Sequence, residues 1–300
     1  MTVGVLVMAH GTPASTEEIE AFYTRIRRGR APEPAQLAEL TARYDAIGGT
    51  SPLAARTRAQ VDALRAMLAA RAPGRYRVAF GAKHTDPLIE EAAAELHASG
   101  VDAVIGLVLT PHASTMGSGE YLERARAALG DTPFTAITSW YDQPAFVQLL
   151  ADRVRTVLAD GTGRRRVVFT AHSLPERVRA SGDPYPDQLE ESARLVAGAA
   201  GLTDWVVAWQ SAGRTPEPWL GPDIRDEVRR LAAEGETDTV VVCPVGFVAD
   251  HLEVLYDLDI ELADVASSVG LGYARTASLN DDPAFVAVLA DVVAAAGPTA

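Results

Sequence analysis

The chain has 300 residues, 48% of them hydrophobic and 22% charged, and this composition supports a sizeable core in one or two domains. Its formal net charge of -13 argues against a nucleic-acid partner. The single cysteine, Cys243, excludes a disulfide within the chain and a four-cysteine iron–sulfur cluster, and no window predicts a signal peptide or a membrane-spanning helix, so we expect a cytoplasmic protein without membrane insertion.

The first half of the chain alternates apolar strands with helical patterns. Residues 3–9 form an uninterrupted apolar run typical of a buried strand, and His10 begins the turn that follows it. A helix begins at Ser15 or Thr16 and ends in the basic stretch 25–30, which is either a solvated helix end or an anion site. Further helices are predicted over 35–47, 53–71, 86–98 and 117–129, and further strands over 75–81, 101–109 and, with its turn, 133–144. This alternation predicts βαβ units and a parallel sheet.

The second half repeats the order of the first. Residues 165–175 echo the first strand and its Ala-His turn, and residues 278–293 share the segment PAFV with residues 139–154. Two more echoes, 205–218 and 239–248, fall between them in the matching order. We therefore predict two similar α/β halves that pack tightly around a cleft. The residues that follow strands and are expected to face this cleft are His10, Lys83, His84, His112, His172, Gln210 and Glu253.

Residues 240–261 combine a buried strand with an acidic helix. Residues 240–243 are apolar without alternation, and Pro244 ends the run. Three carboxylates on the helix that follows are spaced four residues apart and share one stripe: Glu253, Asp257 and Glu261. The stripe is either a solvated acidic face or a place where a cation or a proton lies between carboxylates. Its position after a buried strand favours the second interpretation, because ligands of open α/β sheets bind at such ends.

His172 lies at the end of a predicted strand, where it could meet Glu253 across the cleft. An imidazole beside carboxylates suits a divalent ion or proton transfer near pH 7, although a lone histidine at a strand end is more often structural. No nucleophile elbow, Walker A or GxGxxG motif occurs, which counts against hydrolase, NTPase and dehydrogenase functions. Trp209 and Trp219 belong either to the core or to the wall of a site for a flat ligand.

Eight segments together resemble the ferrochelatase family. They are GVLVMAHGTP, FYTRIRRGR, YDAIGGTSPL, AKHTDP, TAHSLPE, SGDPYPDQL, TPEPWLGPD and PVGFVADHLEVLYDLDIE. The resemblance runs essentially end to end and looks nearest to the compact, soluble Gram-positive type that acts on coproporphyrin III. It implies two Rossmann-like, doubly wound parallel-sheet halves with a porphyrin cleft between them. One half would comprise residues 1–140 plus 277–300, and the other residues 141–276.

The resemblance also implies roles for individual residues. His172 and Glu253 match a pair that delivers the metal and accepts protons, and Asp257 and Glu261 match an outer cation position that could take Mg²⁺. The residues that match positions holding the porphyrin and its propionates are Arg27, Arg43, Tyr44, Ser51 and Tyr121.

His10 departs from the Gram-positive type, which usually has a tyrosine at this position, on the side of the ring opposite His172. A neutral histidine is the stronger iron ligand of the two. His10 could therefore hold the product, help to deprotonate the ring from its second face or alter the metal preference. The alternative is a structural histidine that makes only a hydrogen bond.

The implied reaction inserts Fe²⁺ into coproporphyrin III to give coproheme in haem biosynthesis, by porphyrin distortion, pyrrole deprotonation and metal delivery. Fe²⁺ and the porphyrin would be substrates, no cofactor would be tightly bound, and the next enzyme of the haem pathway would be a transient partner. Three alternatives stay open. The chain could be a chelatase for another divalent metal or for protoporphyrin IX, a carrier that binds tetrapyrrole or metal without turnover, or a scaffold protein that binds no porphyrin.

Overall fold

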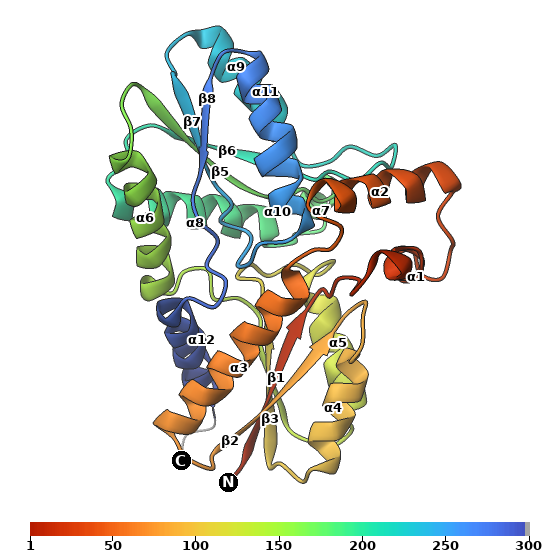
Figure 1. Cartoon of the computed structure of the whole chain (residues 1–300). Coiled ribbons are helices and arrows are strands. Elements are labelled where there is room, and N and C mark those ends of the chain that lie inside the picture. Colours follow the sequence, from red (N-terminus) through yellow and green to blue (C-terminus); the bar gives the residue numbers. More distant parts are fainter. Residues whose placement is uncertain (298–300) are drawn as a thin grey trace.

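The structure of the chain, a computed structural model, describes residues 1–297 and consists of two four-stranded sheets with helices packed on them (Figure 1). All strand pairs are parallel, and the two sheets have the same order, β2-β1-β3-β4 and β6-β5-β7-β8. This confirms the predicted α/β fold of two similar halves. The strands are β1 (Val3–Ala9), β2 (Tyr76–Ala82), β3 (Ala103–Val108), β4 (Phe134–Ile137), β5 (Arg165–His172), β6 (Trp205–Gln210), β7 (Thr239–Cys243) and β8 (Gly272–Arg275).

Four helices of the first half, α2 to α5, lie within three residues of their predicted bounds, whereas α1 is shorter than predicted. The helix predicted to begin at Ser15 or Thr16 begins with a 3₁₀ turn (Thr16–Glu18), and the first α-helix follows it. Gly48 and Gly49, both with positive φ, separate two of the helices. The helices are α1 (Ile19–Ile26), α2 (Pro34–Ala46), α3 (Leu53–Arg71), α4 (Ile89–Ala98), α5 (Ser118–Ala128) and α6 (Pro144–Ala159).

The second half contains several short helical segments among its longer helices. The acidic helix predicted after β7 is wrong as one regular α-helix, because it consists of α10 (Leu252–Leu255), a π-helix η2 (Asp257–Leu262) and α11 (Ala263–Ser268). The Glu261 N–H donates to the Tyr256 carbonyl at 2.9 Å, which is the wider hydrogen-bonding pattern of a π turn. The other helices are α7 (Arg177–Ala180), α8 (Tyr185–Ala200), α9 (Ile224–Glu234) and α12 (Pro283–Ala296).

The last helix of the chain packs against the first half. In Figure 1, α12 lies beside α3, and it contacts α3, β4 and α6, whereas α6 packs mainly on α8 of the second half. One cluster of buried side chains accordingly joins the inner faces of both sheets, with Trp140, Phe146 and Phe285 at their junction. The two halves therefore share a core. The domain boundaries proposed from the sequence stay a prediction.

Candidate active site

A cavity of about 430 Å³ opens between the two halves, where the strands of both sheets end. Most of its lining is apolar, and helices α1 and α2 of the first half cover one side of it. This is the location expected for the ligand of parallel α/β sheets. The polar side chains that line it include those of His10, Thr12, Tyr44, Ser51, Tyr121, His172, His251 and Glu253.

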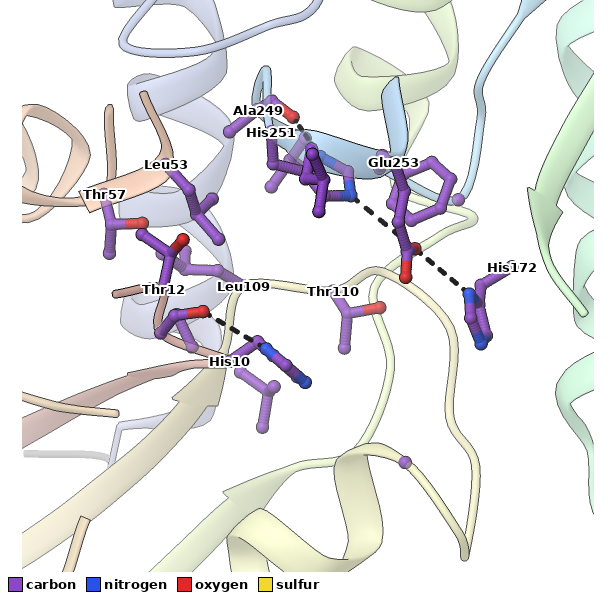
Figure 2. Close-up of a pocket in the computed structure, with 18 of the residues that line it drawn as sticks. His10, Thr12, Leu53, Thr57, Leu109, Thr110, His172, Ala249, His251 and Glu253 are labelled. Carbon is purple, nitrogen blue, oxygen red and sulfur yellow. Dashed lines mark hydrogen bonds and ion pairs between the residues drawn. The ribbon is translucent and has the colours of Figure 1, made fainter. Parts of the chain in front are cut away.

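His172 and Glu253 meet in this cavity as the sequence predicted (Figure 2). His172 is the last residue of β5, Glu253 lies in the first turn of α10, and Nδ1 of the imidazole is 3.0 Å from Oε2 of the carboxylate. Burial acts to lower the pKa of His172, but the charge and hydrogen bond of Glu253, with the charge of Asp257, raise it overall. Burial acts to raise the pKa of Glu253, but His172, followed by His251, holds that pKa well below its usual range. Both shifts favour an ion pair of a protonated imidazole and an ionised carboxylate.

His251 is a second imidazole beside Glu253, and the sequence analysis missed it. Its Nδ1 lies 2.9 Å from the Ala249 carbonyl, which can only accept, so Nδ1 carries the proton. Its Nε2 lies 3.8 Å from Oε2 of Glu253. His251 precedes α10 in an extended conformation, outside any periodic pattern. The only available signal was its place two residues before Glu253.

His10 faces this pair from the first half of the chain (Figure 2). Its Nδ1 lies 3.2 Å from the Gly11 carbonyl and donates to it, so Nε2 of the neutral ring is an unprotonated ligand atom. The ring packs against His84 and Phe22, with ring centroids 4.7 and 5.9 Å away. Removal from bulk water lowers the pKa of His10, which keeps the ring neutral near pH 7.

Three residues predicted to face the cleft do not line it: Lys83, His84 and Gln210. The chain after β2 continues the ladder, since the Lys83 N–H donates to the Ala9 carbonyl and the His84 N–H to the His10 carbonyl. Lys83 consequently pairs with Glu120 at 2.9 Å. Gln210 is buried, and its side-chain amide donates to the Glu253 carbonyl at 2.9 Å, so it supports the site from behind.

Of the two interpretations of Trp209 and Trp219, the structure confirms the core for Trp209 and contradicts the wall of a ligand site for both. Trp209 is 2% exposed and packs in the core against Tyr185, and neither tryptophan lines the cavity. His112 does line the cavity, as predicted, and is 1% exposed. Neither of its ring nitrogens has a hydrogen-bond partner among residues 1–297, and burial lowers its pKa to about 3.

The residues matched to porphyrin positions divide into two groups. Tyr44, Ser51 and Tyr121 line the cavity. Arg27 and Arg43 do not: Nε of Arg27 donates to the Arg30 carbonyl, and Arg43 pairs with two carboxylates of the protein itself. The three lining residues are thus already in place at the cavity, whereas both arginines contact other groups of the same chain.

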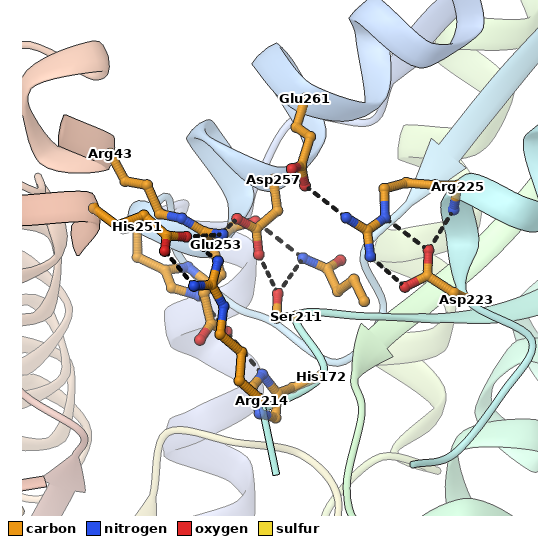
Figure 3. A network of polar contacts seen from close by, with 12 residues as sticks. Arg43, His172, Ser211, Arg214, Asp223, Arg225, His251, Glu253, Asp257 and Glu261 are labelled. Atoms are coloured by element: carbon orange, nitrogen blue, oxygen red, sulfur yellow. Dashed lines mark hydrogen bonds and ion pairs between the residues drawn. The ribbon is translucent and has the colours of Figure 1, made fainter. Parts of the chain in front are cut away.

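The three carboxylates of the acidic stripe follow one another along the helical segment that begins beside the cavity (Figure 3). Asp257 accepts a hydrogen bond from Ser211 and lies 3.3 Å from Arg43, and Glu261 lies 3.4 Å from Arg225. Burial and the charge of Glu253 raise the pKa of Asp257 to about 6, although Ser211 and Arg43 oppose this. In the described part of the chain no three His, Cys, Asp or Glu side chains cluster as a metal site. The outer Mg²⁺ position stays a prediction, and the arginine partners of both carboxylates do not favour it.

Comparison with known proteins places this geometry in a wider context. The Ferrochelatase family model matches residues 2–296. The coproporphyrin III ferrochelatase of Anoxybacillus flavithermus is 45% identical over 299 residues, covering 97% of this chain and 95% of the relative. That of Bacillus subtilis is 46% identical over 299 residues, covering 97% and 96%. A ferrochelatase of Herpetosiphon aurantiacus is 46% identical over 297 residues, covering 96% and 97%.

Solved structures share the fold at much lower identity. SirB from Bacillus subtilis with Fe³⁺ matches with a TM-score of 0.62 at 10% identity, over 99% of this chain and 96% of SirB. CbiX matches with a TM-score of 0.53 at 16% identity, over 98% and 99%. These likenesses concern the fold alone. None of the helices in residues 1–297 is long and apolar enough to cross a membrane.

Proposed function

This chain belongs to the ferrochelatase family, and on that premise we propose that it inserts Fe²⁺ into coproporphyrin III to give coproheme. Relatives at 45–46% identity over nearly their whole length are coproporphyrin III ferrochelatases, which supports this substrate. The observation that carries the proposal is the His172–Glu253 pair, directed into a largely apolar cavity with the Nε2 of His10 on the facing side. A flat apolar macrocycle held between them would present its nitrogens to an imidazole from each half.

The apolar walls supply binding energy, and part of it is available to bend the macrocycle. Bending tilts the nitrogen lone pairs toward one face, which eases entry of the ion. Tyr44, Ser51 and Tyr121 offer hydroxyl groups to propionates. Arg43, and Arg27 beside the lining residue Tyr23, would bind further propionates after exchanging their present partners, because a guanidinium matches a carboxylate bidentately.

Metal delivery requires proton exchange at the same atoms. A proton on His172 competes with Fe²⁺ for the imidazole lone pair, so that proton must leave before the ion binds. Once Fe²⁺ passes into the ring, two pyrrole protons are released, and the vacated His172–Glu253 pair would accept them one after the other, passing on the first before it takes the second. Asp257, whose pKa is about 6, follows Glu253 in the carboxylate stripe and would take up these protons in turn.

An anaerobic absorbance assay tests the proposal. Purified protein at catalytic concentration would be given coproporphyrin III or protoporphyrin IX, each with Fe²⁺, Co²⁺, Ni²⁺ or Zn²⁺. We expect multiple turnovers with Fe²⁺ and a preference for coproporphyrin III, and loss of turnover with retained porphyrin binding in His172→Ala. Near-normal turnover by His172→Ala would refute the assignment of His172.

The other outcomes separate the remaining candidates. Preference for protoporphyrin IX or for another metal would make the chain a chelatase of different specificity. Tight binding without turnover would make it a carrier of tetrapyrrole or metal, and no porphyrin binding at all would leave a scaffold role. A transient contact with the next haem-pathway enzyme stays a prediction, because a free iron porphyrin is redox-active and would benefit from direct transfer.

A further inference from the structure

Helix α2 presents two neighbouring stripes at the rim of the cavity. Leu40 and Tyr44 line the cavity, and Glu39 and Arg43 each precede one of them by a single residue. Residues four apart share one face of a helix, and adjacent residues lie about 100° apart around it. The stripe of Glu39 and Arg43 therefore flanks the cavity wall, with side chains 37% and 29% exposed.

A chain of charges connects this stripe to the second half of the molecule. Arg214, in the loop after β6, contacts both carboxylate oxygens of Glu39 through Nη1 and Nη2. Arg43 lies 3.3 Å from Glu39 on one side and 3.3 Å from Asp257 on the other. Figure 3 shows Arg214 and Arg43 converging from opposite halves beside the carboxylate stripe. We call Arg214, Glu39, Arg43 and Asp257 the rim network.

The outer contact of the rim network is easily exchanged. The Arg214 side chain is 66% exposed, and an exposed ion pair contributes about 0–1 kcal/mol to stability. The Arg214 guanidinium binds both oxygens of Glu39, and it could bind the carboxylate of a ligand in the same bidentate way. In this structure Glu39 therefore takes up the guanidinium of Arg214, which could otherwise bind a carboxylate of a ligand.

The net negative charge of the molecule indicates why a free guanidinium near the cavity would help to bind an anionic ligand. The chain has 27 basic and 40 acidic residues, so its overall field repels an anionic ligand. Local guanidinium groups at the rim are needed to hold a polyanion against that field. Tyr44, Ser51 and Tyr121 inside the cavity have hydroxyl groups but no charge to offer.

We propose that Arg214 binds a carboxylate of the substrate and so selects porphyrins with four carboxylates, and that Glu39 holds the Arg214 guanidinium until the substrate displaces it. This inference rests on the proposed function, since it assigns one more contact to the same substrate. It differs from a simple tie between the halves in predicting competition: Glu39 and the substrate cannot use Arg214 together.

The test measures porphyrin binding by fluorescence quenching and turnover by absorbance in full-length variants. In Arg214→Gln we expect the Kd for coproporphyrin III to rise about tenfold, in line with a charge-assisted hydrogen-bonded pair, while kcat stays within about twofold. The Kd for protoporphyrin IX, which has two carboxylates, should stay unchanged. Glu39→Gln should tighten coproporphyrin III binding about threefold, as expected when a weak internal competitor is removed. The gain should be smaller in the Arg214→Gln background, where the loss of Glu39 still releases the Arg43 guanidinium but no longer that of Arg214.

Matched controls remove the same charges elsewhere on the surface. Arg229 and Asp226 form an exposed pair on α9, so Arg229→Gln and Asp226→Asn reproduce each change of net charge. Equal effects of Arg229→Gln and Arg214→Gln would overturn the inference, because only net charge would then matter. Equal weakening of both porphyrins by Arg214→Gln would also overturn it, because Arg214 would then not distinguish a porphyrin with four carboxylates from one with two. A wild-type protein that binds neither porphyrin would refute the proposed function itself, before any variant is compared.

Discussion

At the scale of single residues, the site is defined by how one carboxylate is placed between imidazoles. Glu253 lies 3.0 Å from His172 and 3.8 Å from His251, and both imidazoles lower its pKa. In return Glu253 raises the pKa of His172 against the effect of burial. The carboxylate therefore controls when the His172 lone pair becomes available to a metal ion.

Replacing Glu253 by glutamine tests this control. Glu253→Gln keeps the shape but removes the charge, so the pKa of His172 should fall. We expect the rate of Fe²⁺ insertion to drop about 10²–10⁴-fold, the range for loss of a group in proton transfer. Because protonated His172 cannot bind the ion, the wild-type rate should decline as pH falls through the raised pKa of His172, and the variant should show this decline at lower pH. Asp226→Asn is the control, and an unshifted pH profile would contradict the role.

His10 makes a prediction that can be read from a spectrum. Its Nδ1 donates to Gly11, so Nε2 can bind the iron of a product held in the cavity. The coproheme complex of the wild-type protein should have the absorption and resonance Raman features of an iron with an imidazole ligand in addition to the ring nitrogens. His10→Phe should lose these features. His84→Gln is the matched control, because His84 packs on His10 without lining the cavity. Identical spectra for the wild type and His10→Phe would leave His10 with a structural role.

His112 should make the fold sensitive to acid. Burial lowers its pKa to about 3 in the folded state, compared with about 6.5 in an unfolded chain. Stability is therefore fully present above pH 6.5, and as pH falls toward 3 the unfolded state takes up a proton that the folded state cannot. The slope is at most about 1.4 kcal/mol per pH unit. His84 acts in the same direction, since its pKa is also lowered to about 3.

Urea unfolding of His112→Gln and His112→Phe between pH 7.5 and 4.5 measures this contribution. Both variants should lose less stability per pH unit than the wild type, whatever their stability at pH 7.5. The surface variant His97→Gln controls for the loss of a histidine. Unfolding free energies that fall in parallel with the wild type would rule out His112 as a source of acid sensitivity.

The sequence predicted which residues lie near the cleft better than it predicted which of their side chains point into it. His10, His112, His172 and Glu253 follow strands and do line the cavity, because the carboxyl ends of parallel strands meet at one edge. His84 follows a strand too, but its backbone extends the ladder to His10 and directs its side chain out of the cavity lining. That extension depends on two tertiary hydrogen bonds. No local pattern of residues reports it.

At the scale of elements, long and strongly periodic segments were predicted well and irregular ones were not. Helix α3 spans the predicted residues 53–71, and β1 spans residues 3–9. The π-helix η2 was missed because its residues are also compatible with an α-helix. Ser211, with a φ of 58°, shows a second irregularity that only the folded chain reveals. The two irregular segments meet, because η2 begins at Asp257 and the Ser211 hydroxyl donates to the Asp257 carboxylate.

At the scale of the whole molecule, the internal repeat predicted two sheets but not the core that joins them. Four echoes in matching order implied two similar halves, and the two sheets have the same strand order. The contacts of α12 with α3 and β4 could not be read from the repeat itself, because the matching helix α6 packs on α8 instead.

Phe285 provides the test of the shared core. It is fully buried on α12, and its ring lies 5.9 Å from that of Trp140 and 6.5 Å from that of Phe146 on α6. Phe285→Ala leaves a cavity at the junction of both halves, so we expect a loss of about 3–5 kcal/mol in the free energy of unfolding.

Hydrogen exchange monitored by mass spectrometry should show faster exchange in Phe285→Ala, by a similar factor, in peptides from β1 and from β5. Phe134 packs only in the first half, so Phe134→Ala should accelerate exchange in β1 more than in β5. If Phe285→Ala accelerated exchange in β1 alone, the two halves would be independent units, and the cleft between them would be free to change width without disturbing either sheet.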